Sequence, residues 1–135
     1  GKTVLDVGCG SGILGIAALA LGAEKCTFID IDPQAVEATE ANLACNGMSA
    51  EVICGDLAEK YDGKADIVLA NLTADILLRL KSSLPGVMSD DGCVIMSGII
   101  DARAGDVENG FFCNGFAKTA EAAENGWRAY KAVKA

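Results

Sequence analysis

The sequence predicts an α/β fold, in which a doubly wound and mostly parallel sheet of seven strands ends in an antiparallel C-terminal hairpin. Three observations support this prediction. Short apolar runs alternate with helical segments along most of the chain, a glycine-rich turn joins the first apolar run to the first helix, and an Asn-Gly pair separates two strand-like segments near the end. The length of 135 residues fits a single domain.

In the first half of the chain, the apolar runs are typical of strands buried on both faces. The first helix follows the glycine-rich turn that ends at Gly12, and Asp32 with Pro33 is typical of an N-cap followed by the first helical residue. This second helix is expected to stop at Gly47. The expected strands are residues 3–7, 26–29 and 51–54, and the expected helices are residues 13–20 and 33–46.

The second half opens with an aliphatic and β-branched strand that ends at Asn71, and a helix with one apolar stripe follows it. Residues 89–92 form a turn sequence before a fifth buried strand. The helix expected after Gly98 is weak, because each of its two internal glycines costs about 1 kcal/mol. Asn125-Gly126 predicts the hairpin turn. The expected strands are residues 65–70, 93–97, 117–123 and 127–133, and the expected helices are residues 73–84 and 101–113.

Composition and charge argue against several classes of protein. The formal net charge of -8 disfavours direct nucleic-acid binding and is compatible with a basic protein partner. The six cysteines form no Cys-x-x-Cys pair, so we expect reduced thiols in a cytoplasmic protein and no metal site. Neither a membrane-spanning run nor a signal peptide is expected. Because the first strand follows Gly1-Lys2 without an initiator methionine, we expect a part of a longer protein.

The most informative segment joins the first strand to the first helix and reads Asp6-Val7-Gly8-Cys9-Gly10-Ser11-Gly12. Its glycines let the backbone turn sharply and approach a ligand closely, and the following helix N-terminus attracts negative charge. Asp30 ends the second strand about 20 residues later, where open α/β sheets bind ribose hydroxyls with an acid. The segment therefore predicts a nucleoside-bearing cofactor.

Two classes of cofactor fit this segment. Gly10-x-Gly12-x-x-Gly15 matches the fingerprint of dinucleotide-binding proteins such as NAD-dependent dehydrogenases. Asp6 would repel a pyrophosphate, however, and it suits the ammonium group of S-adenosylmethionine, so we favour the methyl donor. A glycine turn without any ligand would leave a costly carboxylate beside a buried strand.

Four polar side chains follow successive strands of the predicted parallel sheet. They are Asp6, Asp30, Asp56 and Asn71. Any one of them has a local explanation as a loop cap or a turn residue. Because ligands of open α/β sheets bind outside the carboxyl ends of the strands, the four together predict one cofactor crevice.

The segment at residues 4–12 resembles the first motif of the class I S-adenosylmethionine-dependent methyltransferases, which have a Rossmann-like fold. More narrowly, residues 10–14, 30–36, 70–77 and 97–99 are similar to the methyltransferases of large-subunit ribosomal protein eleven. Trp127 fits the final strand of that family, and the resemblance covers nearly the whole chain.

The resemblance implies a role for each candidate residue. Gly8 and its neighbours would bind the methionine end, Asp30 the ribose, and Ile31 a face of the adenine. The implied cofactor-binding residues are Asp6, Gly8, Cys9, Gly10, Gly12, Asp30, Ile31, Asp56, Leu57 and Asn71, and Asn71 is also the implied catalytic residue. Asn71-Leu72-Thr73 differs from the Asn-Pro-Pro or Asp-Pro-Pro of related amine methyltransferases, which speaks against nucleobase and glutamine-amide substrates.

The family methylates lysine and N-terminal amines of a basic ribosomal protein, which a separate N-terminal domain recognises. Residues 1–135 are therefore expected to form a single S-adenosylmethionine-binding domain that lacks this recognition domain and contacts no nucleic acid or membrane directly. We expect weak or no cofactor binding by this part alone. The alternatives are a methyltransferase of a small molecule or RNA, and a non-catalytic module that binds a nucleotide cofactor.

Overall fold

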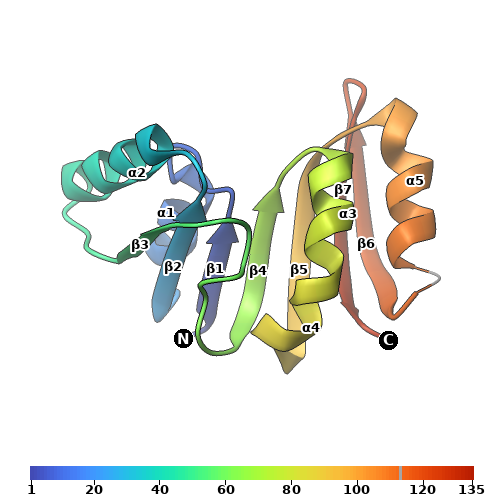
Figure 1. Ribbon diagram of the computed structural model, residues 1–135, viewed down its shortest axis with the longest axis horizontal. Coiled ribbons are helices and arrows are strands. Elements are labelled where there is room, and N and C mark those ends of the chain that lie inside the picture. Colours follow the sequence, from blue (N-terminus) through green and yellow to red (C-terminus); the bar gives the residue numbers. More distant parts are fainter. Residues whose placement is uncertain (113) are drawn as a thin grey trace.

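The computed structural model describes residues 1–112 and 114–135. Its sheet is mixed and seven-stranded, with the order β3-β2-β1-β4-β5-β7-β6 (Figure 1). The strands are β1 (Thr3–Val7), β2 (Lys25–Asp30), β3 (Glu51–Cys54), β4 (Ala65–Asn71), β5 (Met88–Ile100), β6 (Phe116–Glu124) and β7 (Trp127–Lys134). The first five are parallel, and β7 pairs antiparallel with both β5 and β6. The predicted fold class and the predicted hairpin are confirmed.

Helices cover both faces of the sheet and enclose two cores. The helices are α1 (Ile13–Ala20), α2 (Pro33–Cys45), α3 (Ala74–Leu80), α4 (Leu84–Val87) and α5 (Asp101–Phe111), with a 3-10 turn, η1 (Lys81–Ser83), between α3 and α4. Helices α3, α4 and α5 lie on one side of the sheet, over the larger core (Figure 1). Helices α1 and α2 pack on the other side, around Phe28. Gly15 lets α1 approach β2, because a β-carbon there would overlap the Phe28 ring.

The face that carries α1 and α2 is only partly covered. Beyond β1, the side chains of Ile67, Leu69 and Ile95 border an open apolar groove of about 470 Å³ together with one side of α1. Leu21, at the end of α1, borders the same groove and is 89% exposed. This face of the sheet therefore has an uncovered apolar strip beside α1.

The turn predicted at residues 89–92 is wrong. These residues belong to β5 and bulge between two paired positions, because Met88 pairs with Ala65 and Cys93 pairs with Ile67. The Ser89 hydroxyl donates a hydrogen bond to Asp66 Oδ1, at 3.1 Å, and so ties the bulge to β4. The local sequence has turn-forming residues, but pairing with β4 continues on both sides of them.

The single helix predicted at residues 73–84 is also wrong, since the segment is divided into α3, η1 and α4. Pro85 lies in the first turn of α4, where it lacks an N–H group and crowds the preceding turn. The helix after Gly98, by contrast, is complete through Phe111. Its Gly110 packs against Leu78, whose side chain a β-carbon would overlap, so this glycine permits close packing of α3 and α5. Cys113, at the predicted end of this helix, lies outside the described residues.

Within residues 1–112 and 114–135, no helix is both long enough and apolar enough to cross a bilayer. The same residues contain no cluster of three or more His, Cys, Asp or Glu side chains placed to hold a metal ion. The five described cysteines are free thiols.

Candidate functional site

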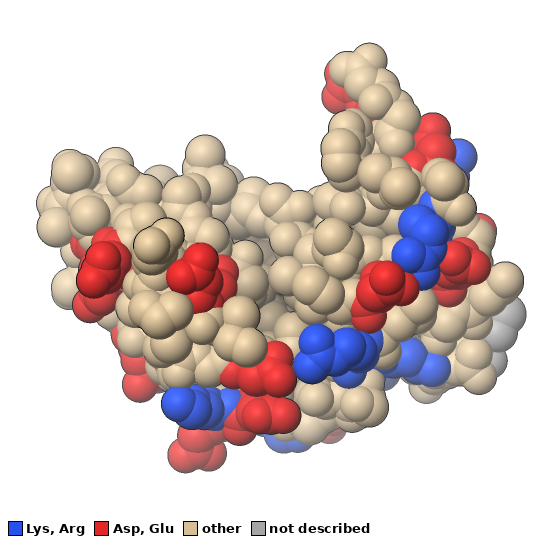
Figure 2. All heavy atoms as spheres, turned by 45° about the horizontal axis from the view of Figure 1, so that its top comes forward, with Lys and Arg blue, Asp and Glu red and all other residues tan. Residues whose placement is uncertain are grey.

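The carboxyl ends of the parallel strands meet at one edge of the sheet, at the top of Figure 1. Figure 2 is turned toward this edge and shows the hairpin of β6 and β7 projecting beyond it, with a hollow beside the hairpin. Two cavities lie along the edge. One has about 220 Å³ and is lined by Gly8, Asp30, Ile31, Asp56, Leu57, Leu72, Ile76 and Arg79. The other has about 580 Å³ and includes Asn71 in its lining.

The glycine-rich turn is held against β2 by its backbone. The N–H groups of Gly8 and Cys9 both donate to the Ile29 carbonyl, at 2.8 and 3.1 Å. Gly8 has a φ of +69°, and a β-carbon on it would overlap the Leu72 side chain. This position therefore requires glycine both for its backbone conformation and for the space around it.

Asp30 organises the turn and the start of α2 at once. Its Oδ2 accepts the Gly10 N–H and its Oδ1 accepts the Asp32 N–H, each at 2.9 Å. A carboxylate oxygen accepts more than one hydrogen bond, so both oxygens keep capacity for hydroxyl donors. The placement of Asp30 in the smaller cavity is compatible with its predicted role at the ribose.

Asp6 is buried instead of lining either cavity. It is 2% exposed, and its Oδ2 accepts the Gly15 N–H from α1 at 3.1 Å. Burial raises the pKa of the Asp6 carboxyl to about 7, against the lowering effect of that hydrogen bond, and the nearby charge of Asp30 raises it further. None of the ion pairs among the described residues includes Asp6. A cation beside it would relieve the cost of ionising this carboxyl.

Two residues of α2 support the turn from below, and the sequence did not point to either. The buried Thr39 hydroxyl donates to the Gly10 carbonyl at 2.9 Å and lies 3.3 Å from the Cys9 sulfur. The Asn42 amide donates to the Ser11 carbonyl at 2.7 Å. Their spacing of three places both on one side of α2, which is the only signal the sequence offers. Burial raises the pKa of the Cys9 thiol to about 11, so Cys9 packs as a neutral side chain.

The acid predicted at the adenine edge already has a protein partner. Arg79 of α3 lies 3.4 Å from Asp56 Oδ2, and both side chains are well exposed. Such a surface pair contributes about 0 to 1 kcal/mol, so it leaves Asp56 available to another donor. Ile31 is 67% exposed beside them, and Leu57 has a left-handed φ of +51°.

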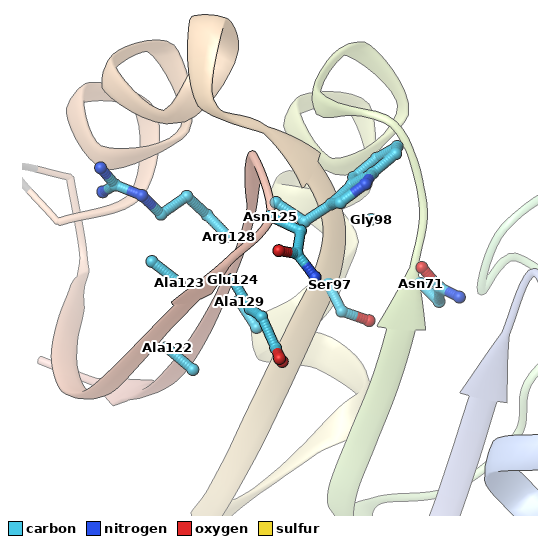
Figure 3. Close-up of a pocket in the computed structure, with 10 residues that line it drawn as sticks. Asn71, Ser97, Gly98, Ala122, Ala123, Glu124, Asn125, Arg128 and Ala129 are labelled. Carbon is cyan, nitrogen blue, oxygen red and sulfur yellow. The ribbon is translucent and has the colours of Figure 1, made fainter.

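Asn71 stands at the junction of β4 with a bulge in β5. Its backbone pairs with Ser97, and the next N–H, of Leu72, donates to the Ser97 carbonyl at 3.1 Å. Ser97 and Gly98 together face the single residue Ala129 of β7, which defines the bulge. Bulges beside active sites re-aim side chains, and this one opens the larger cavity between Asn71 and the hairpin (Figure 3).

The hairpin forms the far wall of the larger cavity. Residues opposite one another in an antiparallel pair share a face, and the register pairs Ala122 with Ala129 and Glu124 with Trp127. All four line the cavity. The sequence placed Trp127 in the final strand but gave no indication of this wall.

The family model described as ribosomal protein L11 methyltransferase (PrmA) matches residues 1–135. A ribosomal protein L11 methyltransferase of Pelotomaculum thermopropionicum is 39% identical over 134 residues, which are 98% of this chain and 44% of that protein. One from Vibrio vulnificus strain YJ016 is 46% identical over 110 residues, 81% of this chain and 37% of that protein. A crystal structure of a ribosomal protein L11 methylase from Lactobacillus delbrueckii subsp. bulgaricus has a TM-score of 0.96 and 36% identity, and the match covers 98% of this chain and 70% of that one. The chain thus spans less than half the length of these two curated relatives.

Proposed function

The chain belongs to the ribosomal protein L11 methyltransferase family, a family of S-adenosylmethionine-dependent enzymes, and we propose that it is the domain that transfers methyl groups to lysine and N-terminal amines of a basic ribosomal protein in the cytoplasm. The observation that supports this proposal is the position of Asn71. It borders a cavity of about 580 Å³ at the same edge of the sheet as Asp30 and the glycine-rich turn.

The residues at this edge fit S-adenosylmethionine. The buried Asp6 carboxyl, with its raised pKa, fits the ammonium of the methionine end, and the turn at Gly8, Cys9, Gly10 and Gly12 fits the rest of that end. Asp30 would accept the ribose hydroxyls with the free lone pairs of its oxygens. Ile31 and Leu57 would contact the adenine ring, and Asp56 would accept a hydrogen bond from its amino group.

Methyl transfer to an amine needs little general acid–base catalysis. S-adenosylmethionine, when bound, supplies a methyl group on a sulfonium sulfur that is an excellent leaving group. A lysine amine has a pKa of about 10.4, so the amine must lose its proton to water before it can attack. The partly enclosed cavity favours the neutral amine by desolvation, and the Asn71 side-chain oxygen would accept one of its hydrogens and orient its lone pair. Alignment of this kind supplies most of the rate.

We propose further that the complete protein recognises its ribosomal substrate through a separate N-terminal domain outside residues 1–135. The partial coverage of the curated relatives supports this view. Residues 1–135 alone are then expected to bind S-adenosylmethionine weakly or not at all and to leave the ribosomal protein unmethylated. Tight binding in calorimetry would contradict this part of the proposal.

The test uses the complete protein that contains this chain, with purified ribosomal protein L11 as acceptor and mass spectrometry as readout. We expect methylated lysine and N-terminal amines, a large loss of kcat in Asn71→Ala, and an unchanged kcat in the matched control Asn109→Ala, an exposed amide on α5. Full activity of Asn71→Ala would remove Asn71 from the mechanism. Stabilisation by NAD but not by S-adenosylhomocysteine in a melting assay would reject the methyl-transfer proposal altogether.

A further inference from the structure

The cavity beside Asn71 has an unusual far wall, built from alternate residues of the β6–β7 hairpin. Cross-strand pairing sets Glu124 directly opposite Trp127 and Ala122 opposite Ala129 on the face toward the cavity. The two alanines leave room on this face, and the cavity reaches about 580 Å³. In Figure 3, Asn71 lies across this space from the hairpin residues.

The charges around the cavity are not balanced. Glu124 is the one carboxylate among the lining residues, and Arg128 is the one cation. Arg128 is held on the other face of the hairpin, where its Nε donates to Asp101 at 3.0 Å and its Nη1 donates to Glu121 at 2.9 Å. Glu124 takes part in none of the ion pairs found among the described residues. The cavity wall therefore carries an unneutralised negative charge.

An exposed aromatic side chain lies beside that charge. Trp127 is 53% exposed, although large aromatic side chains bury most of their surface in folded proteins. A carboxylate and an indole together attract an ammonium group, the first by its charge and the second by the negative face of its ring. The same carboxylate repels the phosphates of a nucleic acid.

We propose that the β6–β7 hairpin is the acceptor-selecting wall of the site, where Glu124 and Trp127 bind the protonated amine of an aliphatic side chain before it reaches Asn71. This inference rests on the proposed function and adds the residues that choose the substrate. The ammonium is held at the wall, gives one proton to water, and enters as a neutral amine. Its nitrogen then forms a bond to the methyl carbon as the carbon–sulfur bond breaks, and the positive charge passes from sulfur to nitrogen.

The first test is the variant Glu124→Gln in the complete protein, with a lysine-containing peptide as acceptor. We expect KM for the peptide to rise about tenfold with kcat unchanged, since a tenfold change corresponds to about 1.4 kcal/mol, typical of a partly exposed charge contact. The matched control Glu40→Gln removes the same charge from an exposed position on α2 and should leave KM unchanged. An equal KM in Glu124→Gln and the native protein overturns the inference.

A second variant tests the shape of the hairpin wall independently of the charge of Glu124. Ala122→Leu adds three carbon atoms to the cavity wall without altering any charge. We expect it to reduce peptide binding at least about tenfold in calorimetry with S-adenosylhomocysteine present, because the added atoms take the space in which the aliphatic part of the acceptor side chain would be buried. The affinity for S-adenosylhomocysteine alone should not change in either variant. If the native protein methylates amines while both variants bind peptide normally, the inference fails and the proposed function stands. If the native protein methylates no amine acceptor, both fail.

Discussion

The Asn71 side-chain oxygen lies so close to the position that a β-carbon on Gly98 would take that the two would overlap. Gly98 adopts a left-handed φ of +79° in the β5 bulge, and its lack of a side chain leaves the space that the Asn71 amide uses. The position of the Asn71 amide therefore depends on a glycine in the neighbouring strand.

The first prediction concerns this contact. Gly98→Ala should displace the Asn71 amide, reduce kcat at least about tenfold, and lower the free energy of unfolding by about 1 to 3 kcal/mol, because the new side chain is strained and overlaps its neighbour. Urea denaturation and methyl transfer measure the two effects. Gly105→Ala is the control, since it adds a β-carbon in open space within a helix and should stabilise the protein by up to about 1 kcal/mol. Native kcat in Gly98→Ala would show that Asn71 does not need this space.

The second prediction is a pH dependence from Asp6. Burial raises its pKa in the folded protein to about 7 from 3.8, so the folded state holds this proton more tightly than the unfolded state. The resulting stabilisation is fully present below the unfolded pKa and is lost as pH rises through about 7. Relative to Asp6→Asn, the native protein should therefore lose about 2 to 3 kcal/mol of unfolding free energy between about pH 5 and about pH 8. A pH-independent difference between the two proteins would contradict this.

The third prediction follows from the same carboxyl. A bound ammonium beside Asp6 should lower the pKa of Asp6, so binding of S-adenosylhomocysteine near neutral pH should release protons. Calorimetry in two buffers with different heats of ionisation measures this release, and Asp6→Asn should abolish it. Proton uptake, or the same release in the variant, would place the ammonium elsewhere.

The fourth prediction concerns the support of the glycine-rich turn. Thr39→Val keeps the shape of the side chain but removes the hydroxyl that the Gly10 carbonyl accepts, and should lower the unfolding free energy by about 1 to 2 kcal/mol. We also expect weaker binding of S-adenosylhomocysteine, because the turn is less well fixed. Thr39→Ser retains the hydroxyl and should restore most of the affinity. Equal affinities in both variants would assign Thr39 to packing alone.

The fifth prediction tests the contact between α5 and the hairpin. The Tyr130 hydroxyl donates to Glu108 Oε2 at 2.5 Å, and Tyr130 is 1% exposed. Tyr130→Phe should therefore lower the unfolding free energy by about 1 to 2 kcal/mol. Tyr61→Phe, at a partly exposed position, should change it by less than about 0.5 kcal/mol. Similar losses in both variants would mean that the Glu108 contact contributes nothing specific.

Most of the fold could be predicted because its signals are local. The strands β1 (Thr3–Val7) and β3 (Glu51–Cys54) have the expected bounds, since apolar runs and their flanking turns mark them directly. The bulge at residues 89–92 could not be predicted from the local sequence. The residues on both sides of it pair with β4, a strand distant in the sequence, and this pairing overrides the local preference for a turn. Gly110 made the helix at residues 101–113 look weak for a related reason. Its lack of a side chain permits close packing against α3, and this contact is not visible in the local sequence.

The candidate site was predicted less completely. The residues of the smaller cavity that follow β1, β2 and β3 were identified, because parallel topology brings strand ends together. Thr39, Arg79 and Glu124 were not, since each belongs to a helix or hairpin whose orientation is decided by packing. The sequence motif also could not show that Asp6 is buried, because its burial depends on how α1 packs over β1.

The extra residue in the β5 bulge also decides which of the following side chains face the core and which face solvent. After the bulge, Ile99 is fully buried and Ile100 is 46% exposed. Deleting Gly98 would restore regular pairing between β5 and β7. It would also turn Ile99 toward solvent and Ile100 toward the core, and α5 would then begin on the opposite face of the sheet. Insertions and deletions should therefore be tolerated poorly at this rim, although it lies at the surface where length variation is normally harmless.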